Sequence, residues 1–201
     1  LSGADAALFS VDTASGAVRL LSAADFEAKP SYDINVIATD AGGLTATQAV
    51  TVTVTDVNEA PVITSPATGT VAENAVPTTV VYTATATDVD AGQTLSYSLS
   101  GADAGAFAIN GTTGEVTLNA SANYEVKSSY SINVIATDDG AGTLAATQAV
   151  VINVTNVNEA PVVTSGATAS VAENAAVSTV IYTATATDVD AGDTEEVSEL
   201  P

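Results

Sequence analysis

Carboxylates are the side chains of this chain that could do chemistry. The sequence has 24 Asp and Glu residues against Arg19, Lys29 and Lys127, and it has no His or Cys. Fourteen of the acids lie in short motifs that recur along the chain (VAEN, ADFE or ANYE, DVD, VIATD and a linker DVNE or NVNE). These acids are Asp25, Glu27, Asp40, Asp56, Glu59, Glu73, Asp88, Asp90, Glu125, Asp138, Glu159, Glu173, Asp188 and Asp190. Because clustered carboxylates repel one another, the pattern predicts a cation among them.

The donor types indicate which cation this is. A site with neither His nor Cys lacks the ligands that transition metals prefer. Dense carboxylates together with backbone carbonyls suit the flexible shell of about six to eight oxygens around Ca²⁺ better than the strict octahedron of Mg²⁺. The sequence therefore predicts Ca²⁺. The alternative is that these acids only solvate the surface and cap turns.

The charge balance excludes several classes of function. A formal net charge of −21 is incompatible with binding nucleic acid or an anionic membrane surface, both of which need basic residues. No continuously apolar run is long enough for a membrane span, so membrane insertion is not expected. Without His, the Ser and Thr hydroxyls have no obvious general base, and we expect no enzyme activity. A glycosidase built from paired carboxylates remains a remote alternative.

The chain repeats itself with a period of about 98 to 100 residues. Residues 1–40 match 99–138, and residues 68–92 match 168–192 after a two-residue insertion. A period of about 100 residues is the size of a β-sandwich module. We therefore expect the C-terminal part of one module at 1–59, a complete module at 60–159, and the N-terminal part of a third at 160–201, whose tail at 195–201 (EEVSELP) diverges from the repeat.

Period-2 alternation and turn residues predict strands throughout the complete module. Tyr130, Ile132, Val134 and Ala136, for example, fall on one face of the segment SYSINVIA. The expected strands lie at 61–72 (broken near Pro66), 79–86, 94–99, 106–109, 115–118, 129–136 and 145–155. Seven short strands and no long helical period predict an all-β, immunoglobulin-like Greek-key β-sandwich.

The motifs VAEN, ADFE, DVNEAP, DVD and IATD, in that order, resemble the calcium-binding motifs of cadherin repeats, in the form common in bacterial surface proteins. The resemblance implies tandem sandwiches of the cadherin type with Ca²⁺ bound where successive modules meet. It implies a first junction formed by Asp25, Glu27, Asp56, Asn58, Glu59, Asp88, Asp90 and Asp138, with the backbone oxygens of Val57 and Ala60. It implies a second junction formed by Glu73, Glu125, Asn158, Glu159, Asp188 and Asp190.

The second junction departs from the first at two positions. Asn123 stands where the first junction has Asp25, and Asn156 stands where it has Asp56. Because calcium affinity depends on the number of charged ligands, we expect the second junction to bind Ca²⁺ more weakly.

The resemblance also implies a function and a location. It suggests a calcium-rigidified structural spacer and adhesion module of an extracellular or surface-anchored bacterial repeat protein. The expected partners are neighbouring modules of the same protein, other copies or surface glycans, with head-to-tail association of partial modules as a further hypothesis. The alternative function is a calcium-dependent polysaccharide-binding module, which an exposed row of aromatic residues would favour.

Overall fold

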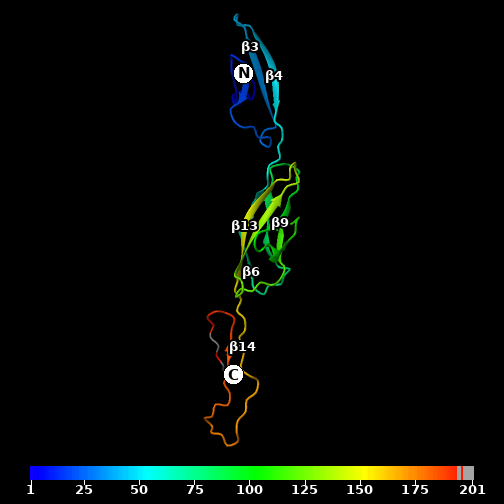
Figure 1. The fold of residues 1–201 in the computed structure, drawn as a ribbon. Coiled ribbons are helices and arrows are strands. Elements are labelled where there is room, and N and C mark those ends of the chain that lie inside the picture. The colour runs from blue at the N-terminus through cyan, green and yellow to red at the C-terminus, as the bar shows by residue number, and fades with distance from the viewer. Residues whose placement is uncertain (194–195, 197–201) are drawn as a thin grey trace. The chain divides into compact units, whose positions relative to one another are not determined.

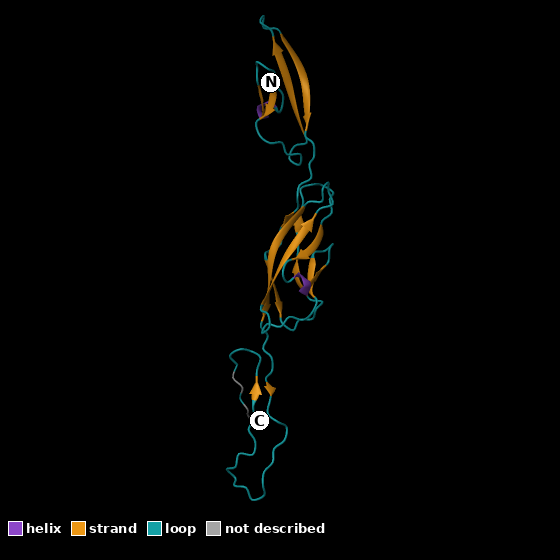
Figure 2. Cartoon of the chain, viewed as in Figure 1, coloured by secondary structure: helices purple, strands orange, loops and turns teal. Residues whose placement is uncertain are grey.

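A computed structural model describes residues 1–193 and 196, which form two compact units. One unit comprises Leu1–Thr64, Thr85–Ser96 and Ala136–Ala146; the other comprises Ser65–Ala84, Tyr97–Ile135 and the chain from Thr147 onward. The regular structure consists almost entirely of strands (Figure 2), and the only helices in the described chain are two 3₁₀ turns, η1 (Ala6–Leu8) and η2 (Ala104–Ala106). The all-β prediction is therefore confirmed. None of the described helices has the length and apolarity needed to cross a membrane.

The N-terminal segment forms two antiparallel pairs. Strand β1 (Phe9–Val11) pairs with β2 (Val18–Leu20), and the longer β3 (Ser31–Thr39) pairs with β4 (Thr45–Thr53). Phe9, Tyr32 and Ile34 form a small buried cluster, in which the Phe9 and Tyr32 rings meet edge to face. Alternation along β3 places Tyr32 and Ile34 on this inner face.

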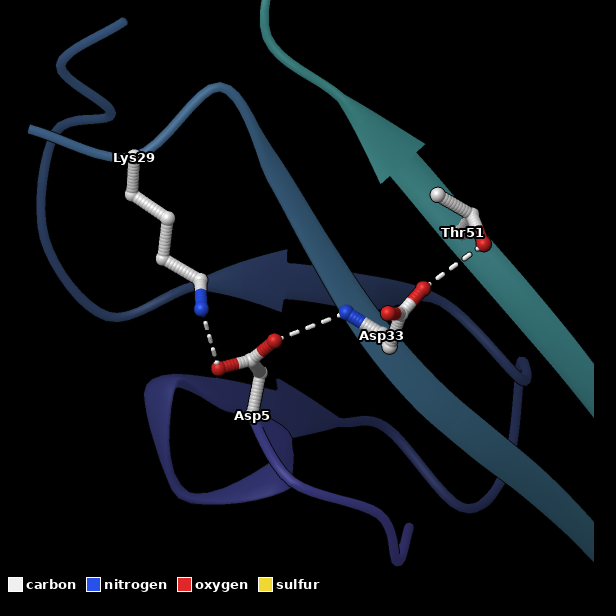
Figure 3. Close-up of polar contacts among 4 residues, drawn as sticks. All are labelled: Asp5, Lys29, Asp33 and Thr51. Atoms are coloured by element: carbon white, nitrogen blue, oxygen red, sulfur yellow. Dashed lines mark hydrogen bonds and ion pairs between the residues drawn. The ribbon is translucent and has the colours of Figure 1, made fainter. Parts of the chain in front are cut away.

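Two of the three basic residues, Lys29 and Lys127, form ion pairs within the fold. Lys29 Nζ lies 2.8 Å from Asp5 Oδ1, and the backbone N–H of Asp33 donates to Asp5 Oδ2 (Figure 3). The same contacts recur 98 residues later, where Lys127 pairs with Asp103 and the Ser131 N–H donates to Asp103. In each repeat the lysine ammonium also lies over a tyrosine ring, Tyr32 or Tyr130. Each lysine therefore ties the residue just before η1 or η2 to the start of the next long strand.

The central part of the chain holds two larger sheets (Figure 1). One has the order β10–β11–β7, formed by Phe107–Ile109, Glu115–Leu118 and Val80–Thr83. The other has the order β6–β13–β12–β9, formed by Thr68–Ala72, Ala145–Thr155, Ser129–Thr137 and Ser96–Ser100. The pairing of β6 with β13 is parallel. The largest fully buried side chains are Ile132, Ile152, Val116, Val134 and Val150.

The predicted strands agree closely with the observed ones, but the count of seven is not confirmed. The first predicted strand is divided at Pro66 into β5 (Val62–Ile63) and β6, because proline has no N–H to donate to a sheet. The second is divided into β7 and β8 (Ala86–Thr87), and β8 pairs with β5 instead of continuing the sheet of β7.

The C-terminal segment contains one short antiparallel pair, β14 (Val162–Val163) with β15 (Ala186–Thr187). It repeats the pairing of β5 with β8 one period later. The predicted divergent tail at 195–201 lies outside the described residues, except for Glu196.

Candidate metal centres

The first linker is held to the DVD loop by backbone hydrogen bonds to carboxylates. The N–H of Glu59 donates to Asp90 Oδ2 over 2.9 Å, and the N–H of Asp90 donates to Asp88 Oδ1 over 3.0 Å. The second oxygen of Asp88 is buried and has no hydrogen-bond partner. A buried carboxylate oxygen without a partner is costly, so this atom requires a ligand.

Three acids from distant parts of the sequence meet beside this linker. Glu27, Asp56 and Asp90 each place a carboxylate oxygen within 4.8 Å of the others. Their effect is visible on Glu59, whose carboxyl pKa is raised by desolvation and then by the charges of neighbouring carboxylates, that of Glu27 first. The carboxylates at this linker therefore repel one another, as the sequence predicted.

Asn58 and Asp138 meet at the same end of the module, although 80 residues separate them. Asn58 Nδ2 donates to Asp138 Oδ2 over 3.0 Å, and Gln93 Nε2 donates to Asn58 Oδ1 over 2.6 Å. Asp138 is 3% exposed, and its other oxygen accepts the N–H groups of Gly140 and Leu144. The predicted contribution of Asp138 to the first linker region is thus matched by a direct contact.

The remaining residues predicted for the first junction lie outside the group of three converging acids. Asp25 accepts the N–H of Ala28 in a local turn, and its charge contributes to the raised pKa of Glu59, but Asp25 is not one of the three converging acids. Val57 is 66% exposed and lines a cleft with Phe26 and Val89. Ala60 is exposed.

The second linker is anchored by a buried glutamate. Glu73 is 2% exposed and its two oxygens accept the N–H groups of Tyr124 and Val157, each over 2.8 Å. These two backbone donors lower the pKa of the Glu73 carboxyl. Glu73 therefore stays ionised and connects the VAEN segment, the ANYE segment and the linker.

Glu73, Glu125 and Glu159 place carboxylate oxygens within 4.8 Å of one another at this linker. The N–H of Glu159 donates to Asp190 Oδ2 over 2.7 Å, which repeats the contact of Glu59 with Asp90. Burial raises the pKa of the Glu159 carboxyl, and the charge of Glu73 raises it further. Glu159 Oε2 and Asp190 Oδ1 are buried without a hydrogen-bond partner.

A third group of acids lies on the loop after β15. Asp188, Asp190 and Asp193 place carboxylate oxygens within 4.8 Å of one another. The structure therefore places the second DVD pair with Asp193, which the sequence analysis did not select. Asn158, which was selected, donates its Nδ2 to the carbonyl of Glu159.

These residues fit Ca²⁺. Each group offers several oxygens and, in a chain without His or Cys, no nitrogen or sulfur ligand that would favour a transition metal. The unpartnered oxygens of Asp88, Glu159 and Asp190 are buried acceptors, which a hard cation would satisfy.

Sequence reasoning missed three contributors besides Asp193. Gln93 Nε2 donates to Asn58 Oδ1, and Gly140 lies close to Asn58. Asn74 donates its Nδ2 to Glu159 Oε1. Asn74 has a signal in the sequence: it recurs as Asn174 in VAEN, and both residues have a positive φ, a conformation that asparagine tolerates better than most residues. The contacts of Gln93 and Gly140 depend on register across the fold, and no local pattern marks them.

Comparison with known proteins finds similarity to one family of domains. Residues 67–155 match the cadherin domain family. This segment is similar to a cadherin repeat. It contains β6 to β13, including the two larger sheets, so the cadherin motifs found in the sequence and the fold found in the structure coincide.

Relatives extend the similarity beyond this segment. Human Protocadherin-1 is 36% identical over 183 residues, which is 86% of this chain and 17% of that protein. The human CDH23 EC21-23 structure has a TM-score of 0.68 at 25% identity, covering 95% of this chain and 64% of the other. The protocadherin gammaB7 EC3-6 cis-dimer structure has a TM-score of 0.62 at 25% identity, covering 92% of this chain and 50% of the other. The fold is thus the immunoglobulin-like β-sandwich of cadherin repeats, and the chain spans only a small part of its curated relatives.

Proposed function

We propose that this chain is a calcium-binding spacer and adhesion segment of an extracellular repeat protein, made stiff at its linkers by Ca²⁺. One observation carries the proposal. At both linkers the N–H of the linker glutamate is bonded to the second Asp of DVD, and buried carboxylate oxygens beside that bond have no partner. The geometry recurs although the two linkers differ in sequence. A purely solvating acidic surface would not bury such oxygens.

The proposed ligands follow from the contacts. At the first linker, Glu27, Asp56 and Asp90 converge, with Glu59, Asp88, Asn58 and Asp138 next to them. At the second, Glu73, Glu125 and Glu159 converge, with Asp190 bonded to the linker. Asp25, Asn158, Asp188 and the carbonyls of Val57 and Ala60 complete the proposed sets by the resemblance to cadherin repeats.

In this proposal, calcium binding is coupled to the ordering of the linkers. Bound Ca²⁺ would supply positive charge and satisfy the free oxygens. The chain itself supplies the hinge restraint: Asp90 holds the N–H of Glu59, and Pro61 fixes φ where the next module begins at residue 60. Without the cation, repulsion among the carboxylates opposes this arrangement, so we expect each linker to loosen. The proposed modules are 1–59, 60–159 and 160–201.

The test is calcium titration of the whole chain after chelation. We expect saturable binding by isothermal titration calorimetry. We also expect a rise in melting temperature, since a ligand at 100 times its Kd stabilises the folded state by about 2.7 kcal/mol. Small-angle scattering should show a narrower distribution of sizes with Ca²⁺ than with chelator. Unchanged calorimetric, thermal and scattering data at millimolar Ca²⁺ would refute the proposal.

Location and partners are proposed by the same reasoning. The relatives named above are cadherins and protocadherins, one of them with a cis-dimer structure, and this supports neighbouring modules and other copies as partners. Bacterial origin stays a prediction from motif form, and those relatives whose source is named are human. Phe9, Tyr32, Tyr82 and Phe107 are buried, whereas Tyr124 and Tyr182 are exposed. Two exposed aromatic side chains on separate segments do not form the row that would favour the polysaccharide-binding alternative.

A further inference from the structure

The loop after each DVD pair carries a side chain that differs between the two linkers. At the second linker it is Asp193, and one period earlier it is Gln93. The N–H of Asp193 donates to the carbonyl of Asp190 over 3.4 Å, which closes a tight turn containing Gly192 at φ +102°. This turn places a carboxylate oxygen of Asp193 within 4.8 Å of oxygens from Asp188 and Asp190.

A second observation shows that this group requires a ligand. Asp190 is only 8% exposed, and its Oδ1 is buried with no hydrogen-bond partner, while its Oδ2 accepts the N–H of Glu159. A buried carboxylate oxygen beside two further carboxylates is strongly disfavoured unless a cation lies among them.

The equivalent side chain at the first linker is neutral, and its known partner is Asn58. Gln93 Nε2 donates to Asn58 Oδ1 over 2.6 Å, and Gln93 Oε1 is buried without a partner, as is Asp88 Oδ2. An amide oxygen is a calcium ligand but carries no charge, so it contributes less affinity than a carboxylate.

We propose that residue 93 or 193 is an additional calcium ligand at each linker, and that the exchange of Gln93 for Asp193 adjusts calcium affinity between them. This inference rests on the proposed function. It also bears on the expected weakness of the second linker, because Asp193 returns one of the two charges removed there by Asn123 and Asn156.

The test uses two substitutions in the whole chain that change charge but keep side-chain size. Asp193→Asn removes a charge, and Gln93→Glu adds one. Tb³⁺ serves as a luminescent substitute for Ca²⁺ that tyrosine sensitises. Tyr124 lines a cleft with Glu125, Asn156 and Val189 at the second linker, whereas the first has Phe26 in the matching place. Tyr124-sensitised luminescence therefore reports the second linker, and Tyr124→Phe should abolish most of it.

We expect Asp193→Asn to weaken Tb³⁺ and Ca²⁺ binding at the second linker at least about tenfold, since even outer-shell partners of a metal cost that much when removed. Gln93→Glu should tighten calcium binding measured by calorimetry and leave the Tyr124 signal unchanged. Glu115→Gln removes the same charge outside the three acidic groups and should change neither. Equal melting temperatures in chelator would show that the variants fold.

Different results would contradict this inference and the proposed function. Wild-type binding together with unchanged affinity in both Asp193→Asn and Gln93→Glu would overturn this inference and leave the proposed function standing. A wild-type chain that binds neither Ca²⁺ nor Tb³⁺ would overturn both.

Discussion

Asp90 and Asp190 each have two roles at the residue scale. One oxygen accepts the N–H of a linker glutamate, and the residue also belongs to a group of converging carboxylates. Each of these side chains therefore joins the linker backbone to a group of acids where a cation is proposed to bind.

Gly140 determines the position of Asn58. A Cβ atom added at residue 140 would lie 2.6 Å from Asn58 Cγ and 2.6 Å from Gln93 Nε2, closer than nonbonded atoms approach. We predict that Gly140→Ala displaces both side chains and weakens calcium binding severalfold, with a small change in melting temperature in chelator because flexible side chains can move aside. Calcium calorimetry and thermal melts measure the two effects. Gly105→Ala, where φ is not positive and the added Cβ contacts nothing, is a control for glycine substitution away from the linkers. Normal affinity in Gly140→Ala would contradict this prediction.

The contacts of Asp103 should make the stability of the fold depend on pH, independently of calcium. Its carboxyl pKa is lowered, first by the hydrogen bond from Lys127 and then by the N–H of Ser131. A pKa below the unfolded value stabilises the fold at pH values above that of the free acid, about 3.9, and the stabilisation is lost as pH falls through the lowered pKa. We predict that Asp103→Asn melts at a lower temperature than the wild type at neutral pH, and that the difference shrinks as the pH falls below about 4. A difference that stays constant from neutral pH to pH 3, roughly one unit below that free-acid pKa, would show that charge is not the cause.

Asp5 offers the matching experiment in the preceding repeat. Lys29 and the N–H of Asp33 lower its pKa in the same way (Figure 3). Asp5→Asn should therefore show the same trend with pH, measured by the same melts.

At the scale of elements, the two copies of the hairpin turn differ in what surrounds them. Gly114, between β10 and β11, and Gly16, between β1 and β2, both have φ +73°, a left-handed conformation that favours glycine. An added Cβ at Gly114 would overlap the carbonyl oxygen of Ala84, whereas at Gly16 it would contact nothing within 4 Å. The difference arises because β11 pairs with β7, while β2 pairs only with β1.

We predict that Gly114→Ala destabilises the chain more than Gly16→Ala. Both substitutions force a left-handed alanine, which costs about 1 to 2 kcal/mol. Gly114→Ala must also move backbone, and overpacking typically adds about 1 to 3 kcal/mol. Urea unfolding of the two variants in chelator measures the difference. Equal losses of stability would mean that the close approach of Ala84 carries no energetic weight.

At the scale of the whole molecule, a net charge of −21 opposes the compact state. Salt screens charges over a distance of about 8 Å at physiological ionic strength. We predict that the melting temperature in chelator rises when NaCl is raised to about 0.5 M, and rises less when Ca²⁺ is present, because bound cations have already neutralised the acids nearest to one another. Scanning calorimetry checks both conditions, with KCl in place of NaCl to separate screening from specific ion binding. A salt effect unaltered by Ca²⁺ would argue that the acids are merely solvated.

The all-β fold and most strand positions follow from the sequence alone, and the recurring acids predict the kind of chemistry. Alternation in SYSINVIA, the break at Pro66 and the recurring acids are local features, and local backbone preference and charge can be read from neighbouring residues. The resemblance to cadherin repeats also predicted that Asn58 and Asp138 act together, and these two side chains are hydrogen-bonded.

Only the tertiary structure decided which oxygens meet. Asp193 joins Asp188 and Asp190, Gln93 bonds Asn58, and Gly140 leaves room for both, none of which the motifs indicated. The splitting of the second predicted strand into β7 and β8 was likewise decided by pairing, since β7 joins β11 and β8 joins β5. The cause is the same in each case. These contacts join residues that are remote in sequence, or they depend on the geometry of a single loop. Strand register and close packing, which the finished fold imposes, determine them.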